Sequence, residues 1–229
     1  MQSQAILIFA RTNSKRLPSK VLKKIILNKT LLEIILLRLK KFLKIDIIVC
    51  TSNLKIDDKI VKICKRNKIK YFRGDLNNVF NRTINCLKKY KLKSFIRINA
   101  DRPFVDFDEI KKILKVSKKK KFDIITNNIK DNCPKGLICE LAKSKIFFDI
   151  NEKKLTNSEK EHIFDYFYKN KKSYKFHYLK NKLYKKNKKI NFSIDSLADL
   201  NRVKKIYKIL DNIYTPTKKI LLLKNEKKL

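Results

Sequence analysis

Four positively charged side chains follow one apolar run near the start of the sequence. The run extends from Ala5 to Ala10, and the cations are Arg11, Lys15, Arg16 and Lys20. A short continuous apolar run is typical of a strand that is buried on both faces in a parallel sheet. Open α/β sheets bind ligands at the carboxyl ends of their strands, so the basic loop predicts a site for an anion such as a nucleoside triphosphate. A surface loop with merely solvated charges is the alternative that so short a motif leaves open.

A carboxylate stands at a comparable place farther along the chain. Asp101 follows a predicted strand at 94–98 and precedes Pro103. A bound triphosphate needs Mg²⁺ to bridge its oxygens and to steady the transition state, and a hard cation takes carboxylate oxygen. Asp101 therefore has the chemistry of a magnesium ligand. Its local sequence equally allows a cap of the turn before Pro103.

The elements that must position these side chains alternate between strand and helix. Strands are predicted at 5–10, 46–52, 69–72, 94–98, 122–126, 174–179 and 190–194. Helices are predicted at 30–44, 57–67, 77–90 and 106–116, and in segments that end near 170 and 210, with Thr30 and Asp106 as caps. Right-handed crossovers between such units give a mostly parallel sheet with helices on both faces. The pattern predicts one α/β domain over 1–229, with a small β excursion at about 130–189 and a helix or tail at 215–229.

The charge of the chain raises a different class of function. A net charge of +38 is typical of proteins that bind nucleic acid or an anionic surface. Of the 59 basic residues, however, only nine are arginine, and the chain has two glycines and four prolines. Residue types with GC-rich codons are thus scarce, which favours drift toward lysine over selection for a specific nucleic acid. Aromatic and basic residues also do not interleave as in a base-stacking platform, although a basic protein that binds RNA or another polyanion stays open as the alternative.

The cysteines and the apolar runs indicate the compartment. The five cysteines are odd in number and form no Cys-x-x-Cys pair, and they are Cys50, Cys64, Cys86, Cys133 and Cys139. Several lie at apolar positions of predicted elements, so we expect buried free thiols in a reducing compartment. No apolar run approaches the roughly 18 residues of a membrane span, and the amino terminus lacks a signal-peptide pattern. The sequence therefore predicts a cytoplasmic protein without membrane insertion.

Five segments, in order, resemble the sugar cytidylyltransferases. Residues 9–20 read Phe-Ala-Arg-x-x-Ser-x-Arg-Leu-Pro-x-Lys, which resembles the amino-terminal signature of that family. Later segments resemble its Arg-x-x-Gly-Asp-x-Pro-x-x-Asp, Tyr-Pro-x-Gly-Leu-Asp-x-Glu-Val, Ser-x-x-Glu-His and x-x-Val-Asp-x-x-x-Asp-Leu motifs, at 95–106, 133–141, 157–163 and 191–200. The resemblance covers most of the chain. It is greatest to the spore coat polysaccharide biosynthesis protein F type, relatives of the acylneuraminate and 3-deoxy-manno-octulosonate cytidylyltransferases.

The resemblance implies a fold and a reaction. The fold is the Rossmann-like, GT-A type fold of nucleotide-diphospho-sugar transferases. The reaction moves CMP from CTP to the anomeric hydroxyl of an acidic sugar and releases pyrophosphate. The implied cofactor is Mg²⁺, held by Asp101 and Asp195, whose strand ends converge in that fold, and Arg11 and Lys20 complete the catalytic set. The other implied nucleotide contacts are Phe9, Ala10, Ser14, Arg16 and Arg73, and the implied sugar contacts are Glu140, Glu161 and His162. A homodimer is expected because dimers are usual in the resembled families.

Four positions depart from the family pattern. Members commonly carry Gln, Gly and Gly where this chain has Phe9, Asn13 and Ala100, and Asp where it has Ile138. Lost glycines near phosphates add a Cβ where backbone N–H donors approach. A related nucleotidyltransferase with another nucleotide or acceptor, and an inactive homologue, therefore stay open as alternatives.

Overall fold

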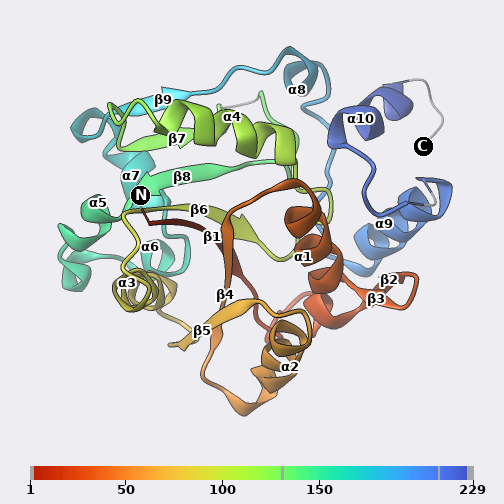
Figure 1. The fold of residues 1–229 in the computed structure, drawn as a ribbon, viewed down its shortest axis with the longest axis horizontal. Coiled ribbons are helices and arrows are strands. Elements are labelled where there is room, and N and C mark those ends of the chain that lie inside the picture. Colours follow the sequence, from red (N-terminus) through yellow and green to blue (C-terminus); the bar gives the residue numbers. More distant parts are fainter. Residues whose placement is uncertain (1–2, 130–131, 211, 226–229) are drawn as a thin grey trace.

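A seven-stranded sheet forms the centre of the molecule, as the computed structural model of residues 3–129, 132–210 and 212–225 shows (Figure 1). Its strand order is β5-β4-β1-β6-β8-β7-β9. The strands are β1 (Gln4–Phe9), β4 (Asp46–Ser52), β5 (Lys70–Gly74), β6 (Ser94–Asn99), β7 (Ile124–Thr126), β8 (Glu140–Lys143) and β9 (Phe176–Tyr178). The strands β1, β4, β5 and β6 are parallel to one another, β8 runs antiparallel between β6 and β7, and β9 is parallel to β7. The expected mostly parallel α/β fold is confirmed.

Helices cover both faces of this sheet. One face packs against α1 (Leu31–Phe42), α2 (Asp58–Arg66), α4 (Phe107–Ser117), α9 (Leu197–Leu210) and α10 (Thr217–Asn225). The other packs against α3 (Val79–Lys89), α5 (Ser144–Phe148) and α7 (Asp165–Lys169), with α6 (Asn157–Glu161) beside α3. The short α8 (Lys182–Lys186) and the hairpin of β2 (Lys24–Ile26) and β3 (Lys29–Thr30) complete the fold. None of the described helices is long and apolar enough to cross a membrane.

The central strand β1 shows why continuous apolar runs lie here. Ile6 and Ile8 point into the core on the α1 side, whereas Ala5 and Leu7 point into the core on the α3 side. All four side chains are fully buried. Because strand side chains alternate between faces, only a strand covered on both sides needs every residue apolar.

Helix α1 is apolar on nearly all sides because other elements surround it. Thr30 and Glu33 form a capping box at its start, which satisfies backbone donors that have no partner within the helix. Arg38 is fully buried in its middle and donates hydrogen bonds to the carbonyl oxygens of Ile213, Thr215 and Val105. One guanidinium group thus holds the segment before α10 against α1 and the start of α4.

The segment after β7 differs from the expectation in three ways. Residues 190–194 were expected as a strand but form only a bridge between Asn191 and Lys135. The helix expected to end near 170 is two short helices, α6 and α7, separated at His162. The region 130–189 places β8 and β9 in the main sheet and otherwise forms short helices, with 130–131 outside the described residues. The expected terminal helix is α10, and 226–229 lie outside the described part of the chain.

The cysteines are free thiols, as expected. Cys50, Cys64, Cys86 and Cys139 are buried, and Cys133 is half-buried. Burial raises the pKa of Cys64 to about 12, so this thiol stays protonated and unreactive at neutral pH.

Gly136 allows two loops to meet next to the segment that precedes α9. Its φ is +93°, and a Cβ added there would lie 2.6 Å from the backbone nitrogen of Ser193. The loops are joined by hydrogen bonds from Lys135 N–H to the Ile190 carbonyl and from Phe192 N–H to the Lys135 carbonyl. The backbone conformation and the close approach both require glycine at this position.

We therefore expect Gly136→Ala to lower the free energy of unfolding by about 1–3 kcal/mol, through backbone strain and displacement of the second loop. Urea unfolding measures the change. Gly74→Ala is the matched control, because its added Cβ would also make a close contact, at 2.8 Å from Cγ of Arg82, but the φ of Gly74 lies outside the left-handed region. Equal effects of the two substitutions would contradict the role given to Gly136.

Candidate functional site

A cleft of ≈ 480 Å³ opens at the carboxyl ends of β1 and β6. Its walls are the loop after β1, the start of α3, the end of β6, the junction of α6 and α7, and the segment before α9. Ten of the residues expected at the site line it, namely Phe9, Ala10, Arg11, Ser14, Arg16, Lys20, Asp101, Glu161, His162 and Asp195. A second hollow of ≈ 330 Å³ lies at the amino ends of the same strands, near Gln4 and Ser94, and none of these ten residues lines it.

Asp57 fixes the start of the basic loop. Its fully buried carboxylate accepts hydrogen bonds from the N–H of Thr12 (2.8 Å) and from its hydroxyl (2.6 Å). The hydroxyls of Thr51 and Ser52, at the end of β4, donate to its other oxygen over 3.1 Å and 2.5 Å. Burial alone would raise the pKa of Asp57, but these donors outweigh burial and hold its pKa below the ordinary value. One charged carboxylate thus ties the loop after β1 to the end of β4.

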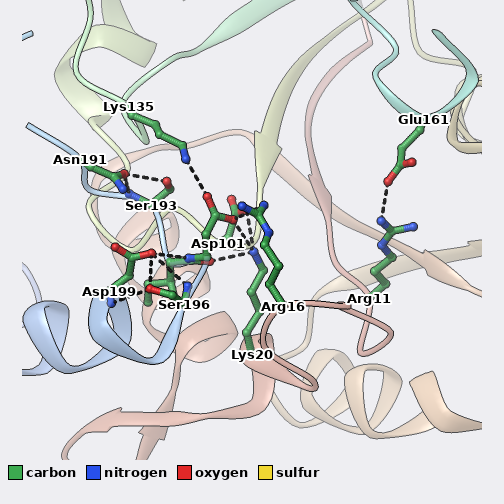
Figure 2. Close-up of polar contacts among 12 residues, drawn as sticks. Arg11, Arg16, Lys20, Asp101, Lys135, Glu161, Asn191, Ser193, Ser196 and Asp199 are labelled. Carbon is green, nitrogen blue, oxygen red and sulfur yellow. Dashed lines mark hydrogen bonds and ion pairs between the residues drawn. The ribbon is translucent and has the colours of Figure 1, made fainter. Parts of the chain in front are cut away.

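Lys20 lies where the basic loop meets the carboxylates. Its Nζ is 2.9 Å from Oδ2 of Asp101 and 3.3 Å from Oδ1 of Asp195, and it donates to the Ile194 carbonyl over 2.7 Å (Figure 2). The N–H of Ile194 donates in turn to the Asp101 carbonyl over 3.0 Å. The two aspartates that the resemblance paired therefore lie side by side around one cation.

Asp195 carries two further cations. Arg16 Nη2 lies 2.9 Å from its Oδ1, and Lys135 Nζ lies 2.7 Å from its Oδ2. Lys135 and Lys20 come from different segments and contact different oxygens of Asp195 (Figure 2). Burial would raise the pKa of Asp195, but the hydrogen bond from Lys135 and the charge of Lys20 lower it further than burial raises it, so Asp195 is ionised at neutral pH. Lys135 was not expected at the site, because nothing in the sequence separates it from the other lysines.

The backbone of Asp195 is held by the start of α9. Oδ2 of Asp199 accepts from the N–H groups of Asp195 and Ser196, each over 3.0 Å. Burial would raise the pKa of Asp199, yet these donors lower it to about 2. Asp199 therefore stabilises the helix start and aims Asp195 at the cleft.

The paired carboxylates have the donor set that a hard cation requires. Oxygens of Asp101 and Asp195 converge on one positively charged nitrogen, and both groups face the cleft. The ammonium group of Lys20 thus occupies a position where two carboxylates bind a cation. Carboxylate oxygens in this arrangement suit Mg²⁺, so these two residues fit the role of metal ligands.

The junction of α6 and α7 brings an acid to the basic loop. Nη2 of Arg11 donates to Oε1 of Glu161 over 2.5 Å, and both side chains are partly exposed (Figure 2). His162 lines the cleft next to this pair. The expected phosphate contact and the expected sugar contact are therefore paired with each other. An exposed ion pair contributes about 0–1 kcal/mol, so a bound anion can separate them.

The backbone at the end of β1 is already in use. The N–H of Ala10 donates to the Cys50 carbonyl over 3.1 Å, and the carbonyl of Phe9 accepts from Ala100 N–H over 2.9 Å. The expected nucleotide contact of Ala10 therefore cannot use its N–H, because that donor already has a backbone partner. The Ala10 carbonyl and the Phe9 side chain are what this strand end can offer.

Glu140 cannot touch a substrate as the sequence led us to expect. It is 1% exposed, and its carboxylate accepts from Nε of Arg97 over 2.6 Å and from the hydroxyl of Tyr168 over 2.8 Å. Arg97 lines the cleft in its place. Two signals could have identified Arg97: it is the first residue of the Arg-x-x-Gly-Asp motif, and it lies two residues before Asn99 and so shares its face of β6.

Arg73 also lies outside the cleft. Its guanidinium forms an ion pair with Asp58 over 2.6 Å and donates to the carbonyls of Ser52 and Leu54. These bonds hold the loop after β4 against β5. The structure therefore gives Arg73 a structural role and not the expected nucleotide contact.

Arg82 is a buried cation that the sequence did not single out. It is 2% exposed, lines the cleft from α3 and donates to the Asp75 carbonyl over 2.7 Å. Its Nε has no hydrogen-bond partner, and no carboxylate within the described residues forms an ion pair with it. Burial lowers the pKa of Arg82, and the nearby charge of Arg11 lowers it further. Such a group favours an anion or an acceptor oxygen in the cleft.

Comparisons with known proteins point to one family. A family model described as cytidylyltransferase matches residues 5–228. The spore coat polysaccharide biosynthesis protein SpsF of Bacillus subtilis is 27% identical over 214 residues, which are 90% of this chain and 87% of that protein. A cytidylyltransferase of Leptospira borgpetersenii has a TM-score of 0.92 at 24% identity, covering 99% of this chain and 96% of that one. A structure titled CMP:2-keto-3-deoxy-manno-octonic acid synthetase complexed with CTP has a TM-score of 0.68 at 12% identity, covering 90% and 99%.

The environment of Asp57 predicts an acid-sensitive stability. Because its folded-state pKa lies below 3.8, its contribution is present above that pH and is lost as the pH falls through the folded-state pKa. Asp57→Asn should lower the free energy of unfolding by about 2–3 kcal/mol at pH 7, and the deficit should shrink below about pH 4.

Urea unfolding at pH 7, 5, 4 and 3 checks this expectation. Asp46→Asn is the control, because Asp46 is exposed and pairs only with the exposed Lys70. Its cost should stay within about 0.5 kcal/mol. A deficit for Asp57→Asn that does not change with pH would show that the charge of Asp57 is not what ties the loop.

Proposed function

The chain belongs to the cytidylyltransferase family, and from this premise we propose that it transfers CMP from CTP to the anomeric hydroxyl of an acidic sugar and releases pyrophosphate. The observation that carries the proposal is the convergence of Lys20, Asp101 and Asp195 in a cleft with an excess of cations. Nucleotidyl transfer requires cations around the triphosphate and carboxylates for a metal in one place.

The charge of the cleft supports a triphosphate ligand. Six cationic residues line it, namely Arg11, Lys15, Arg16, Lys20, Arg82 and Arg97, against the three carboxylates of Asp101, Glu161 and Asp195. In this reading Arg11, Arg16 and Lys20 turn from their carboxylate partners to the β- and γ-phosphate oxygens. Their charges then stabilise the pyrophosphate that leaves.

The carboxylates of Asp101 and Asp195, once Lys20 has turned to the phosphates, are available to bind a metal ion. Asp101 and Asp195 would hold Mg²⁺, which would neutralise phosphate charge and withdraw electrons from the α-phosphorus. Asp199 and the hydrogen bond between Ile194 and Asp101 keep the two carboxylates side by side while Lys20 moves. The protein thus pre-organises the ligands before the nucleotide arrives.

The acceptor approaches from the wall formed by α6 and α7. Its hydroxyl oxygen attacks the α-phosphorus, the bond between the α-phosphorus and the bridging oxygen to the β-phosphate breaks, and pyrophosphate leaves. The hydroxyl proton passes to a carboxylate of the cleft. Among the lining carboxylates Glu161 is the one that Lys20 does not hold, and it is freed when Arg11 binds phosphate.

An acidic sugar as acceptor draws support from the relatives. SpsF is named as a polysaccharide biosynthesis protein, and a structural neighbour is named as a synthetase of a CMP-linked sugar acid. Ile138, which replaces the family's Asp, does not line the cleft, and its carbonyl accepts a hydrogen bond from Arg102. Its side chain therefore gives no ground against an acidic acceptor. The homodimer and the cytoplasmic location stay predictions.

Asp101→Asn tests the reaction. We expect pyrophosphate release from CTP with Mg²⁺ to fall about 100-fold or more in kcat, because the variant loses a metal ligand that acts in the transition state. The assay uses a panel of acidic sugars that includes N-acetylneuraminate and 3-deoxy-manno-octulosonate.

Asp108→Asn is the matched control, because Asp108 is a half-exposed aspartate on α4 that does not line the cleft. Its rates should equal those of the unmodified protein. Release that is insensitive to Asp101, or a preference for another nucleoside triphosphate, would overturn the proposed site or the proposed donor. Calorimetry that detects no binding of Mg-CTP would overturn both.

A further inference from the structure

Arg97 occupies a distinct position in the wall of the cleft. It lies on β6 on the same face as Asn99, and both residues line the cleft together with Asp101. The neighbouring Ile96 and Ile98 point into the opposite core. A charged side chain in the middle of a central strand loses much of its hydration, so it needs compensation from the protein or from a ligand.

The protein compensates the lost hydration of the Arg97 guanidinium from one side only. Oε2 of Glu140 accepts from Nε over 2.6 Å and also contacts Nη2, and the Phe164 ring lies 5.1 Å from the guanidinium carbon. Burial would lower the pKa of Arg97, but the charge of Glu140 raises it more, so the guanidinium stays charged. Nη1 has no hydrogen-bond partner in the described part of the chain, and it is not among the buried unpartnered atoms.

Glu140 is in turn fully engaged away from the cleft. Its Oε1 accepts from the hydroxyl of Tyr168 over 2.8 Å, and that hydroxyl lies 3.3 Å from Oγ1 of Thr126. Burial and the charge of Glu140 raise the pKa of Tyr168, so it remains a donor at neutral pH. The carboxylate therefore fixes the plane of the Arg97 guanidinium and leaves Nη1, on a residue that lines the cleft, without a partner in the described part of the chain.

We propose that Arg97 binds the carboxylate of the acceptor and thereby selects a sugar acid over a neutral sugar, an inference that rests on the proposed function. The other cations of the cleft are less suited to this role. Arg11, Arg16 and Lys20 lie on the loop that the phosphates require, and Lys15 is exposed on the same loop. Arg82 lies on α3 and, within the described residues, has no carboxylate ion-pair partner that would fix the plane of its guanidinium. Arg97 instead lies beyond Asn99 and near Phe164, which follows Glu161 and His162 on the acceptor wall.

The test compares acids with analogues that lack the charge. The probes are N-acetylneuraminate and 3-deoxy-manno-octulosonate, each beside its carboxamide, with CTP, Mg²⁺ and pyrophosphate release as the readout. The variant is Arg97→Met combined with Glu140→Gln, so that no unpaired charge is left buried and Tyr168 keeps an acceptor. A thermal midpoint near that of the unmodified protein verifies that the variant folds.

We expect the KM for the accepted acid to rise about 10- to 100-fold, because a charge-assisted hydrogen bond is lost. The KM for CTP should not change, and the preference for the acid over its carboxamide should fall to near unity. Arg97→Lys, which keeps the charge but loses the planar fork, should restore part of the preference. If Arg97 and Glu140 had only a structural role, the double variant would change the thermal midpoint and would keep the preference for the acid over its carboxamide.

Arg66→Met serves as the matched control, since it breaks the ion pair of Arg66 with the buried Glu33 far from the cleft. It should leave the preference and both KM values unchanged. A double variant that still prefers the acid would overturn the role of Arg97 while cytidylyl transfer stands. Turnover with neutral acceptors only, or Mg-CTP binding without turnover of any acid, would overturn the acceptor class and Arg97 together. Absence of Mg-CTP binding would instead show that the proposed function itself is wrong.

Discussion

The meeting of Asp101 and Asp195 around Lys20 is the interaction on which the site depends, because it joins three segments that are far apart in sequence. Two carboxylates that contact the same ammonium group repel each other unless cations lie between and beside them. Lys20 supplies the shared cation, and Arg16 and Lys135 neutralise the outer side of Asp195. The protein without ligand therefore already has the charge pattern of a complex, with side-chain cations where a metal and phosphates would otherwise lie. Ligand binding then exchanges partners within a formed cluster and does not have to assemble one, which limits the cost of reorganisation.

This cluster is precise because backbone contacts behind it are fixed by buried groups. Asp57 holds the start of the basic loop at Thr12, and Asp199 holds the N–H groups on either side of the Asp195 carbonyl. Gly136 lets the loop that carries Lys135 approach Ser193. Asp57 acts on the loop after β1, whereas Asp199 and Gly136 both act on the segment before α9, and none of the three lines the cleft. Charged groups in the interior thus serve to position the residues that contact ligand.

The sequence predicted the parts of this structure whose signal is local. Apolar runs identified β1 and β4, and a capping threonine identified the start of α1. The ordered motifs identified Lys20, Asp101 and Asp195. The sequence did not predict the residues whose role depends on a partner far away in the chain. Asp57 binds Thr12 across 45 positions, and Arg97 binds Glu140 across 43. Glu140 was assigned to the substrate because a motif gives the residue type but not its burial. The segment 190–194 has strand-like residues, yet β8 takes the place beside β6 in the sheet, so that segment pairs with one loop residue only.

The distribution of arginine separates the site from the general charge of the chain. Four of the nine arginines line the cleft, namely Arg11, Arg16, Arg82 and Arg97, whereas among the lysines that the structure describes only Lys15 and Lys20 do so. Lysine supplies charge on a flexible stem, whereas arginine supplies several donors in a fixed plane. A surface that attracted polyanions by charge alone could be built from lysine, and its attraction would weaken steeply with salt. A cleft that must hold oxygens at defined positions needs arginine, and partly buried donors are screened much less. The net charge of +38 therefore does not indicate the ligand, whereas the arginines that line the cleft indicate one with oxygens at defined positions.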